Sequence, residues 1–395
     1  MSRYRLYPTE AQEQALLTHC GHARYVWNLA VEQHSWWTPR RGPAPSYVAQ
    51  SRQLTEARKE FDWLREGSQN VQQQALRDFG QAMRNFFAGT HRRPTWRKQG
   101  VHQSFRITDT CKVERLSRKW GQVTVPKVGW VRFRWTRPVP EAKSYRITRD
   151  RSGRWHVAFA AIPVEIPGPG TGEIVGVDRG VRVSAALSTG ELLHCPTLSP
   201  KREERLGRLV RKLSRAKKGS NRRKRVKAAI ARLMAREADT RKDWIEKTST
   251  DLARRFDVIR FEDLRVKNMT ASARGTIEQP GKNVRAKAGL NRSISRNGWG
   301  QLLARTEHKT PGRVEVVNPA YTSQRCSECG HVDSNSRESQ ALFCCTACAY
   351  TSNADVNAAR NIAAGHAVTA RGGRALAGPV NREPQLMASL LKASA

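Results

Sequence analysis

The stretch that most constrains this chain runs from residue 322 to residue 362. It contains two C-x-x-C pairs separated by fifteen residues, a spacing typical of a four-cysteine zinc site. The predicted ligands are Cys326, Cys329, Cys345 and Cys348. Four thiolates complete a tetrahedral zinc and leave no open position, so the pattern predicts a structural metal and not a catalytic one.

Two neighbouring side chains offer other ways to count the ligands. Cys344 precedes the second pair, but its partner at the same spacing would be Ala347, which is no ligand. His331 could replace a cysteine, although the site is full without it. Oxidised or inert cysteines are a further alternative, which two such pairs at this distance disfavour. We therefore expect Cys344 and His331 to lie outside the ligand set.

The same stretch continues into a predicted helix with one carboxylate near its start. Residues 353–361 read NADVNAARN, which favours a helix start and places Asp355 seven residues after Cys348. Aspartates at helix starts are mostly caps or solvated charges. Asp355 is therefore significant only if other carboxylates join it.

The charge of the chain predicts a polyanionic partner. Lys and Arg total 71 against 34 Asp and Glu among 395 residues, which gives a net charge of +37. Such an excess favours nucleic acid, with strong salt dependence, over a membrane surface. No run of eighteen apolar residues and no signal peptide is evident. The other cysteines lack disulfide-like spacing, so we expect a cytoplasmic, nucleoid-associated protein.

The first 165 residues predict helices inserted between strands. Residues 1–8 alternate as a first strand, Thr9 is a predicted N-cap, and residues 9–90 have helical patterning. Short alternating stretches in 91–165 predict a small β-barrel. One predicted helix carries three amides that could bond adenine edges, with a solvated helix face as the alternative for each: Asn70, Gln73 and Gln74.

After a Pro/Gly-rich linker at 166–172, the pattern changes to that of a second domain, 173–320. An apolar strand ends in Asp178 and precedes two more strands, a meander typical of the beginning of an RNase H-like domain. A later strand, 256–264, runs into two acids, of which Glu262 is in step with Val258 and Asp263 points to the other face. A flexible lid is predicted over 265–287 and a helix over 288–309.

Between these strands, residues 200–252 predict a basic helical hairpin with few balancing acids. Like charges repel unless a polyanion lies between them, so nucleic acid is favoured over a solvated coiled coil. The cations around its turn are Lys217, Lys218, Arg222, Arg223 and Lys224. The C-terminal part divides into a zinc domain at 321–352, a last helix at 353–366 and a disordered tail at 367–395.

Three carboxylates now stand at the ends of predicted core elements: Asp178, Glu262 and Asp355. Clustered carboxylates hold the two divalent ions that neutralise the attacking and leaving oxygens of a phosphodiester. Oxygen ligands select magnesium or manganese over zinc. No serine or cysteine triad and no Walker-type glycine loop is legible. The residues thus predict nuclease chemistry.

Several motifs resemble those of the TnpB (OrfB) family, which bacterial insertion sequences encode and to which small type V CRISPR effectors are related. They are, in order, GVDRGV (176–181), FEDL (261–264), the two C-x-x-C pairs and NADVNAARNI (353–362). The resemblance also includes RLYPTEAQEQALL (5–17), NVQQQALRDF (70–79), SRAKKGSNRRKR (214–225), AGLNRSI (288–294) and NPAYTSQRCSECG (318–330). It covers the chain to about Gly365.

This resemblance implies an RNA-guided DNA endonuclease with a RuvC domain. On it, Asp178, Glu262 and Asp355 are catalytic and bind Mg²⁺ or Mn²⁺, and the four cysteines hold structural Zn²⁺. The implied fold is a multidomain α+β fold, with a helical recognition lobe inserted in a wedge β-barrel before the RuvC domain. The implied partners are a noncoding guide RNA from the same element and double-stranded target DNA beside a short flanking motif. Arg292, in AGLNRSI, is a further predicted nucleic-acid contact.

Three other functions are compatible with parts of the sequence. An RNA-guided DNA-binding regulator without cleavage predicts loss of an acid, and all three are present. A transposase, or an accessory protein of DNA strand transfer, suits the same fold and acids and needs no RNA. A zinc-dependent transcription factor leaves Asp178 and Glu262 without a role. The oligomeric state, monomer or dimer, stays open.

Overall fold

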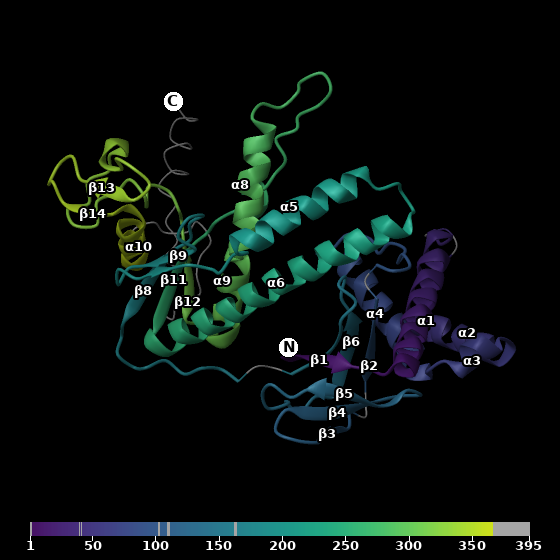
Figure 1. Cartoon of the computed structure of the whole chain (residues 1–395). Coiled ribbons are helices and arrows are strands. Elements are labelled where there is room, and N and C mark those ends of the chain that lie inside the picture. The colour runs from purple at the N-terminus through teal and green to yellow at the C-terminus, as the bar shows by residue number, and fades with distance from the viewer. Residues whose placement is uncertain are drawn as a thin grey trace. The chain divides into compact units, whose positions relative to one another are not determined.

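The computed structural model describes residues 2–38, 40, 42–101, 103–108, 111–161 and 164–365 (Figure 1). The tail predicted at 367–395 lies outside the described residues. The chain divides into two compact units. The first comprises Met1–Ile162 with Leu206–Ala235, and the second comprises Pro163–Arg205 with Arg236–Ala395.

The first unit contains a seven-stranded antiparallel sheet in the order β2-β6-β7-β1-β5-β4-β3. β1 lies between β7 and β5, although the other six strands follow the helices in sequence. The helical segment is therefore inserted after the first strand, as the sequence predicts. The strands are β1 (Ser2–Tyr7), β2 (Ser104–Thr108), β3 (Val113–Arg115), β4 (Trp120–Val125), β5 (Gly129–Arg134), β6 (Ser144–Arg149) and β7 (Trp155–Phe159).

Aromatic side chains fill one face of this sheet. The Tyr4 ring lies edge-on to Phe133 and Phe159, with centroids 5.4 and 5.5 Å away. The Tyr145 hydroxyl on β6 donates to the Thr124 carbonyl on β4, 2.6 Å away, although three strands separate β6 from β4. The sheet is therefore strongly curved. Among the described residues its ladder ends at β2 and β3, so closure into a barrel stays a prediction.

Four helices accompany this sheet: α1 (Glu10–Ser35), α2 (Tyr47–Glu60), α3 (Asp62–Glu66) and α4 (Gln69–Phe87). Thr9 caps α1 through a capping box with Gln12, which confirms the predicted helix start. The apolar face of α1 is buried, at Leu16, Ala23, Val26, Trp27 and Ala30. Helices α1 and α4 pack against each other and both contact β2.

The second unit contains a five-stranded sheet in the order β10-β9-β8-β11-β12. β8, β9 and β10 form the predicted antiparallel meander, and β11 and β12 run parallel to β8. The bounds are β8 (Ile174–Asp178), β9 (Ala185–Leu187), β10 (Leu192–Leu193), β11 (Val258–Glu262) and β12 (Val314–Val317).

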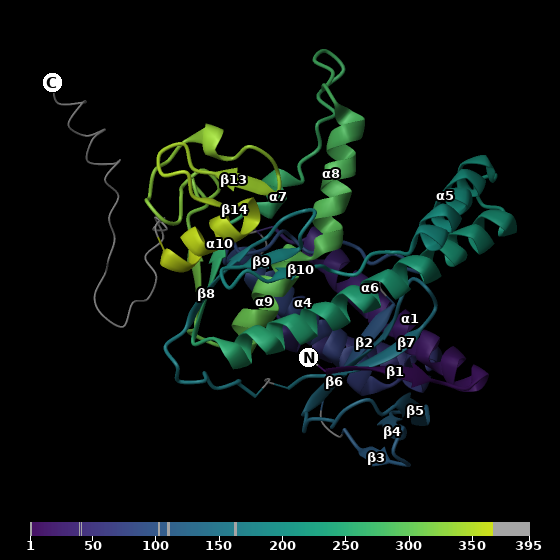
Figure 2. The ribbon, with the colours of Figure 1, turned by 60° about the vertical axis from the view of Figure 1, so that its left-hand side comes forward.

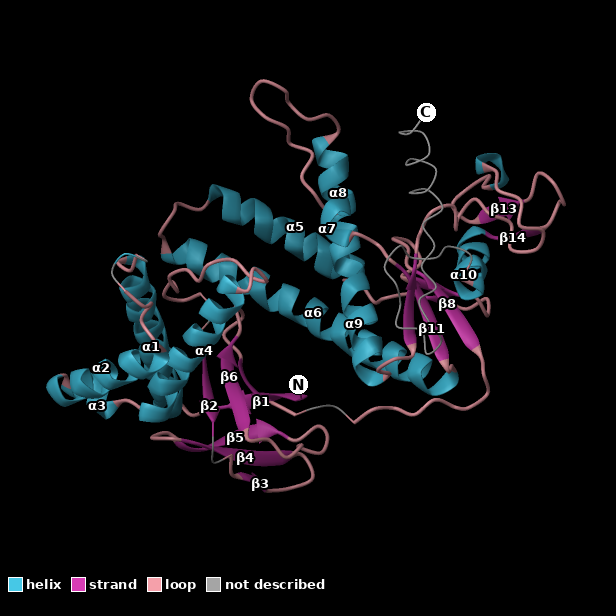
Figure 3. Cartoon of the chain, turned by 180° about the vertical axis from the view of Figure 1, so that it is seen from behind, coloured by secondary structure: helices cyan, strands magenta, loops and turns pink. Residues whose placement is uncertain are grey.

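Helix α10 (Ala354–Ala364) packs against β8, β9 and β11 (Figure 3). Gly176 permits this approach, because a Cβ there would lie 2.0 Å from the Ala359 carbonyl oxygen and 2.4 Å from the Ala363 nitrogen. These are backbone atoms and cannot turn away. The glycine of GVDRGV is therefore required where α10 crosses the strand that ends in Asp178.

The basic segment folds as the predicted helical hairpin, α5 (Pro200–Arg215) and α6 (Asn221–Arg255) (Figure 2). None of the residues of α5, all of which are described, is buried. A helix this rich in Arg and Lys offers too little apolar surface to fill a core. Charge, and not packing, is its main property.

The segment after β11 differs from the prediction in one respect. Instead of one helix over 288–309, α8 (Val284–Asn297) and α9 (Trp299–Lys309) are separated at Gly298. Gly298 is left-handed, with φ +68°, and no regular helix continues through that conformation. The predicted lid at 265–287 contains α7 (Val266–Met269) and an isolated bridge between Gly275 and Pro280.

Between β12 and α10 lies a small module formed by η2 (Ser334–Ser336), β13 (Leu342–Cys344) and β14 (Thr351–Asn353). Its two strands pair in antiparallel fashion around a core that includes Cys326, Phe343 and Cys345. Within the described part of the chain, no helix is long and apolar enough to cross a membrane.

Candidate active site and four-cysteine centre

Two of the predicted acids lie at the same edge of the second sheet. Asp178 is the last residue of β8 and Glu262 is the last residue of β11. These strands are parallel neighbours, with Val177 opposite Phe261, so the two acids occupy the next position of the register. Parallel strands present their carboxyl ends at one edge, and topology alone therefore brings this pair together.

The third acid, Asp355, is the second residue of α10. The cap of this helix is Asn353, whose Oδ1 accepts hydrogen bonds from the Asp355 and Val356 nitrogens. Asp355 is thus not the cap, which was the alternative for it. It is buried, and its Oδ1 accepts from Nη2 of Arg337, 3.1 Å away.

The three acids interact electrostatically. Burial and the negative charges of Glu262 and Asp355 together raise the pKa of Asp178 to about 8, against the positive charges of Arg337 and Arg179. Burial also raises the pKa of Glu262, while a hydrogen bond from Thr322 and the two arginines lower it. The site therefore concentrates negative charge that a cation would stabilise.

The carboxylate oxygens of the three acids lie less close together than the sulfur atoms of the four cysteines. Among the described residues, the four cysteines alone place three or more candidate ligand atoms within 4.8 Å of one another. Arg337 carries a positive charge beside Asp355 and lowers the pKa of both other acids. Oxygen donors with this negative field fit hard divalent ions such as Mg²⁺.

Three residues that contact the acids were not predicted as site residues. Arg179 is buried, donates to the main-chain oxygens of Glu262 and Trp299, and lies over the Phe261 ring. The Thr322 hydroxyl donates to Oε1 of Glu262, 2.8 Å away. Arg337 is the third. Arg179 could have been inferred from its position after Asp178, whereas Arg337 and Thr322 stand in the cysteine-rich stretch and carry no signal of their own.

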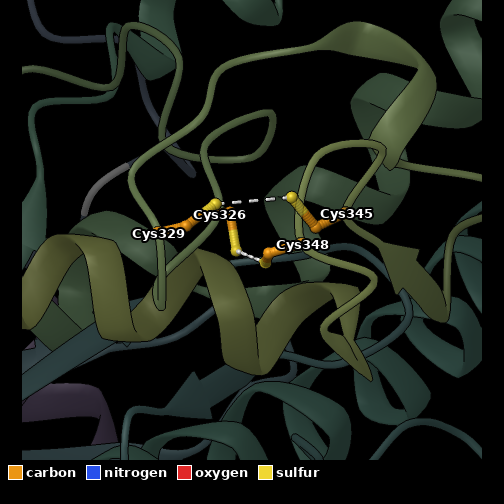
Figure 4. A group of neighbouring side chains, drawn as sticks. All are labelled: Cys326, Cys329, Cys345 and Cys348. Atoms are coloured by element: carbon orange, nitrogen blue, oxygen red, sulfur yellow. Dashed lines mark hydrogen bonds between the residues drawn. The ribbon is translucent and has the colours of Figure 1, made fainter.

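The four cysteines converge in the small module (Figure 4). The Sγ atoms of Cys326 and Cys348 are 3.8 Å apart, and those of Cys329 and Cys345 are 3.6 Å apart. Zn–S bonds of about 2.3 Å in a tetrahedron separate sulfur atoms by about 3.8 Å, so the cluster fits zinc. Main-chain N–H groups lower the pKa of Cys345 to about 6, which favours its thiolate.

Cys344 and His331 are not members of this cluster, as the spacing predicts. Cys344 is the last residue of β13, beside the ligand position. The His331 carbonyl accepts from the Cys326 nitrogen at 2.8 Å, so the residue contributes its main chain to the loop.

The three predicted base-reading amides on α4 make hydrogen bonds within the protein. Asn70 donates to the Thr108 carbonyl and accepts from the Thr108 nitrogen on β2. Gln73 accepts from the hydroxyls of Tyr47 and Ser51. Gln74 is buried and donates to Asp78. Reading a base edge would require these bonds to open, so base contact by these residues stays a prediction.

Most of the predicted cations are exposed. Lys217, Lys218, Arg222 and Lys224 are exposed around the turn of the hairpin, and Arg292 is exposed on α8. Arg223 is the exception. It is partly buried, and its Nη1 donates to the carbonyls of Leu213 and Ala216 at the end of α5.

Three family models match this chain. A "Probable transposase" model of OrfB_IS605 matches residues 157–273, and a "Cas12f1-like, TNB domain" model matches 299–362. A "Helix-turn-helix domain" model matches 2–42. Among the described residues of that last segment, the structure has a strand and one long helix, β1 and α1.

A solved structure, a cryo-EM structure of a Cas12f1–sgRNA–target DNA complex, has a similar fold. Its TM-score is 0.55 at 14% sequence identity, over 89% of this chain and 82% of that one. The fold of this chain is thus a Cas12f-like α+β fold, with a helical N-terminal region, two large sheets and a four-cysteine cluster near the C-terminus.

Two full-length relatives narrow this class to a family. "Putative RNA-guided DNA endonuclease InsQ" of Escherichia coli K12 is 36% identical over 98% of this chain and 97% of its own length. A "Putative RNA-guided DNA endonuclease" of Streptomyces pristinaespiralis is 34% identical over 94% of this chain and 90% of its own. The chain belongs to the TnpB (OrfB) family.

Proposed function

We propose that this protein is an RNA-guided DNA endonuclease that cleaves double-stranded DNA beside a short flanking motif. The observation that carries the proposal is the meeting of Asp178, Glu262 and Asp355 from three separate elements. The names of its full-length relatives support the same activity. The guide would be a noncoding RNA from the transposable element that encodes the protein.

The domain functions follow the predicted boundaries. Residues 9–90 would form the recognition lobe, and residues 1–8 and 91–165 its wedge β-barrel. Residues 173–320 and 353–366 would form the RuvC-like nuclease domain, with the zinc domain at 321–352 inserted. The insertion of α1–α4 after β1 and the order of the second sheet support this division.

The three acids would hold Mg²⁺ or Mn²⁺, and the four cysteines would hold a structural Zn²⁺. Divalent ions at the acids supply charge neutralisation for the attacking and leaving oxygens of the phosphodiester. Arg179 fixes the main chain at Glu262 and Trp299. Thr322 and Arg337 bond the carboxylates of Glu262 and Asp355. These contacts hold acids from three elements at one site.

The exposed cations would contact nucleic acid through its phosphates. A net charge of +37 provides the sequence-independent part of binding, and Lys217, Lys218, Arg222, Lys224 and Arg292 are exposed to contribute to it. Base pairing between guide and target then reads the sequence, while the protein reads shape and the flanking motif. A protein acting on chromosomal DNA in this way would be cytoplasmic and associated with the nucleoid.

The test begins with RNA that copurifies with the protein expressed from its native locus. We expect one dominant species with a constant scaffold and an end that matches DNA beside the element. That RNA is then supplied with a plasmid library that carries the matching target and randomised flanks. The parent should cut targets with one flanking motif.

Asp178→Asn should abolish cutting and leave the copurified RNA unchanged, because the amide keeps the shape and removes a ligand charge. Asp263→Asn is the matched control, since Asp263 follows Glu262 but is exposed. It should cut as the parent does. Full cleavage by Asp178→Asn would refute the metal assignment. Heterogeneous RNA together with joining of transposon ends would instead favour the transposase function.

A further inference from the structure

Thr322 contacts one of the proposed metal-binding acids from outside the acid-bearing elements. It lies four residues before Cys326, in the segment that joins β12 to the cysteines. Its Oγ1 is 2.8 Å from Oε1 of Glu262, and the exposed fractions of the two residues are 5% and 7%. The contact is therefore buried from water, where a hydrogen bond to a charged group is strong.

The Thr322 hydroxyl has a second possible acceptor. The carbonyl of Pro319 lies 3.1 Å from Oγ1 and also faces the Thr322 nitrogen, 3.4 Å away. A hydroxyl carries one proton, and the carboxylate is both nearer and charged. The proton is thus directed to Glu262.

The main chain of Thr322 is held by the helix that carries Asp355. Its carbonyl accepts from Nδ2 of Asn361 on α10, 2.9 Å away, and the same Nδ2 donates to the Arg325 carbonyl at 2.7 Å. One turn earlier, Asn357 donates to the Arg325 carbonyl and accepts from the Ser327 nitrogen, at 2.8 and 2.9 Å. Both asparagines are fully or almost fully buried.

Thr322 therefore connects three parts of the unit. Its side chain bonds Glu262 on β11, its carbonyl bonds α10, and its own segment leads directly to the first zinc-type cysteine. Residues 322–327 cannot shift without disturbing either Glu262 or the asparagine pair. The loop that leads into the cysteine centre is thus also a support for two of the three acids.

We propose that Thr322 is a positioning residue that orients the Glu262 carboxylate for a divalent ion. The inference rests on the proposed function, because it takes Glu262 as a metal ligand. A ligating carboxylate depends on its hydrogen-bond partners for its orientation. Without the hydroxyl, the Glu262 carboxylate loses the buried contact that fixes its orientation.

The experiment measures Mn²⁺ binding to the full chain, freed of nucleic acid, from the electron paramagnetic resonance signal of free Mn²⁺ at neutral pH. Thr322→Val replaces the hydroxyl with a methyl of the same shape. We expect about 10- to 100-fold weaker binding, the usual effect of losing such a partner. Zinc content should stay at the parent value, which shows that the cysteine centre is intact.

Thr322→Ser keeps the hydroxyl and should restore the affinity. Thr322→Ala, which cannot clash, should show the same loss as Thr322→Val and replaces it if the valine variant does not fold. Parent-like Mn²⁺ affinity in both the valine and alanine variants would overturn the inference. So would an equal loss in Thr322→Ser, because the hydroxyl would then not be the cause.

Asp178→Asn in the same assay separates this inference from the proposed function. We expect it to abolish the binding that the assay detects. If it binds Mn²⁺ as the parent does, the proposed metal site is wrong and the inference falls with it. If Asp178→Asn abolishes binding while Thr322→Val and Thr322→Ala leave it unchanged, the metal site stands and only the role of Thr322 is refuted.

Discussion

At the residue scale, the acid cluster is a concentration of negative charge that two arginines only partly offset. Asp178 is at its centre electrostatically, since Glu262 and Asp355 both raise its pKa and Arg337 and Arg179 both lower it. The net result is a carboxyl that keeps its proton to about pH 8 without a metal. Folding therefore places a carboxyl where ionisation is costly.

The stability of the protein without divalent ions should consequently fall as pH rises. In the unfolded chain Asp178 ionises near 3.8, whereas in the folded chain it ionises near 8. Between these values the folded state binds more protons, so stability decreases with increasing pH, by at most about 1.4 kcal/mol per pH unit for one group. Thermal unfolding of the zinc-loaded protein, without added Mg²⁺ or Mn²⁺, from pH 6.5 to 8 measures this slope.

Asp178→Asn removes the titrating group and should flatten that slope, with higher stability than the parent at pH 8. Saturating Mg²⁺ should flatten it in the parent, because the metal binds the ionised form. Burial lowers the pKa values of His19, His22 and His34. Their effect on the stability of the protein has the opposite direction, because stability is lost as pH falls and they become protonated. Working above pH 6.5 limits their contribution. Identical slopes for variant and parent would contradict the raised pKa.

At the element scale, the site depends on α10 lying directly on β8. Gly176→Ala should therefore be destabilising by about 1–3 kcal/mol, the usual cost of overpacking, because the added Cβ meets backbone atoms of α10. It should also weaken Mn²⁺ binding, since β8 and α10 carry Asp178 and Asp355. Urea unfolding measures the first effect and paramagnetic resonance the second.

Gly300→Ala is the matched control for this substitution. Gly300 lies within α9 of the same unit, and nothing lies within 4 Å of its added Cβ. Alanine there should be neutral or stabilising, by up to about 1 kcal/mol. If Gly176→Ala proved as stable as this control, α10 would not be packed on β8 as described.

Elements with a strong periodic pattern could be predicted from the sequence, and those set by a single residue or by distant contacts could not. The strands ending in Asp178 and Glu262, the basic hairpin and the Thr9 cap follow local patterns. Strand β3 has only three residues, too few for alternation to show, whereas strand β2 alternates between partly buried and buried residues. The break at Gly298 depends on one left-handed residue, which spacing does not reveal.

The candidate site likewise contains residues that the sequence alone identifies and residues that only the fold identifies. The clustering of the four cysteines follows from spacing alone, because C-x-x-C pairs impose local geometry. The acids needed the sheet topology, which brings residues 178, 262 and 355 to one site. Thr322 and Arg337 touch these acids across 60 and 18 residues of sequence, so only the folded chain identifies them.

At the scale of the whole molecule, charge is the dominant property, and the hairpin formed by α5 and α6 carries a dense and exposed part of it. Because none of the residues of α5 is buried, this helix contributes little to a core. Its cations therefore serve another purpose. Their sequence-independent attraction to phosphate would supplement base pairing by the guide. This contribution of the cations predicts that the affinity for nucleic acid depends measurably on salt concentration.

Replacing Lys217, Lys218, Arg222 and Lys224 by Gln should lower the affinity for nucleic acid and reduce its salt dependence. Each lost contact to duplex DNA should reduce the slope of log K against log salt by about 0.9, and each to a single strand by about 0.7.

The matched control exchanges Lys for Arg and Arg for Lys at the same positions, which keeps the charge. Fluorescence anisotropy with labelled RNA and duplex DNA over a salt series measures both. A slope unchanged in the Gln variant would show that these cations do not contact phosphate, because counterion release depends on the number of charges engaged and not on which residues surround them.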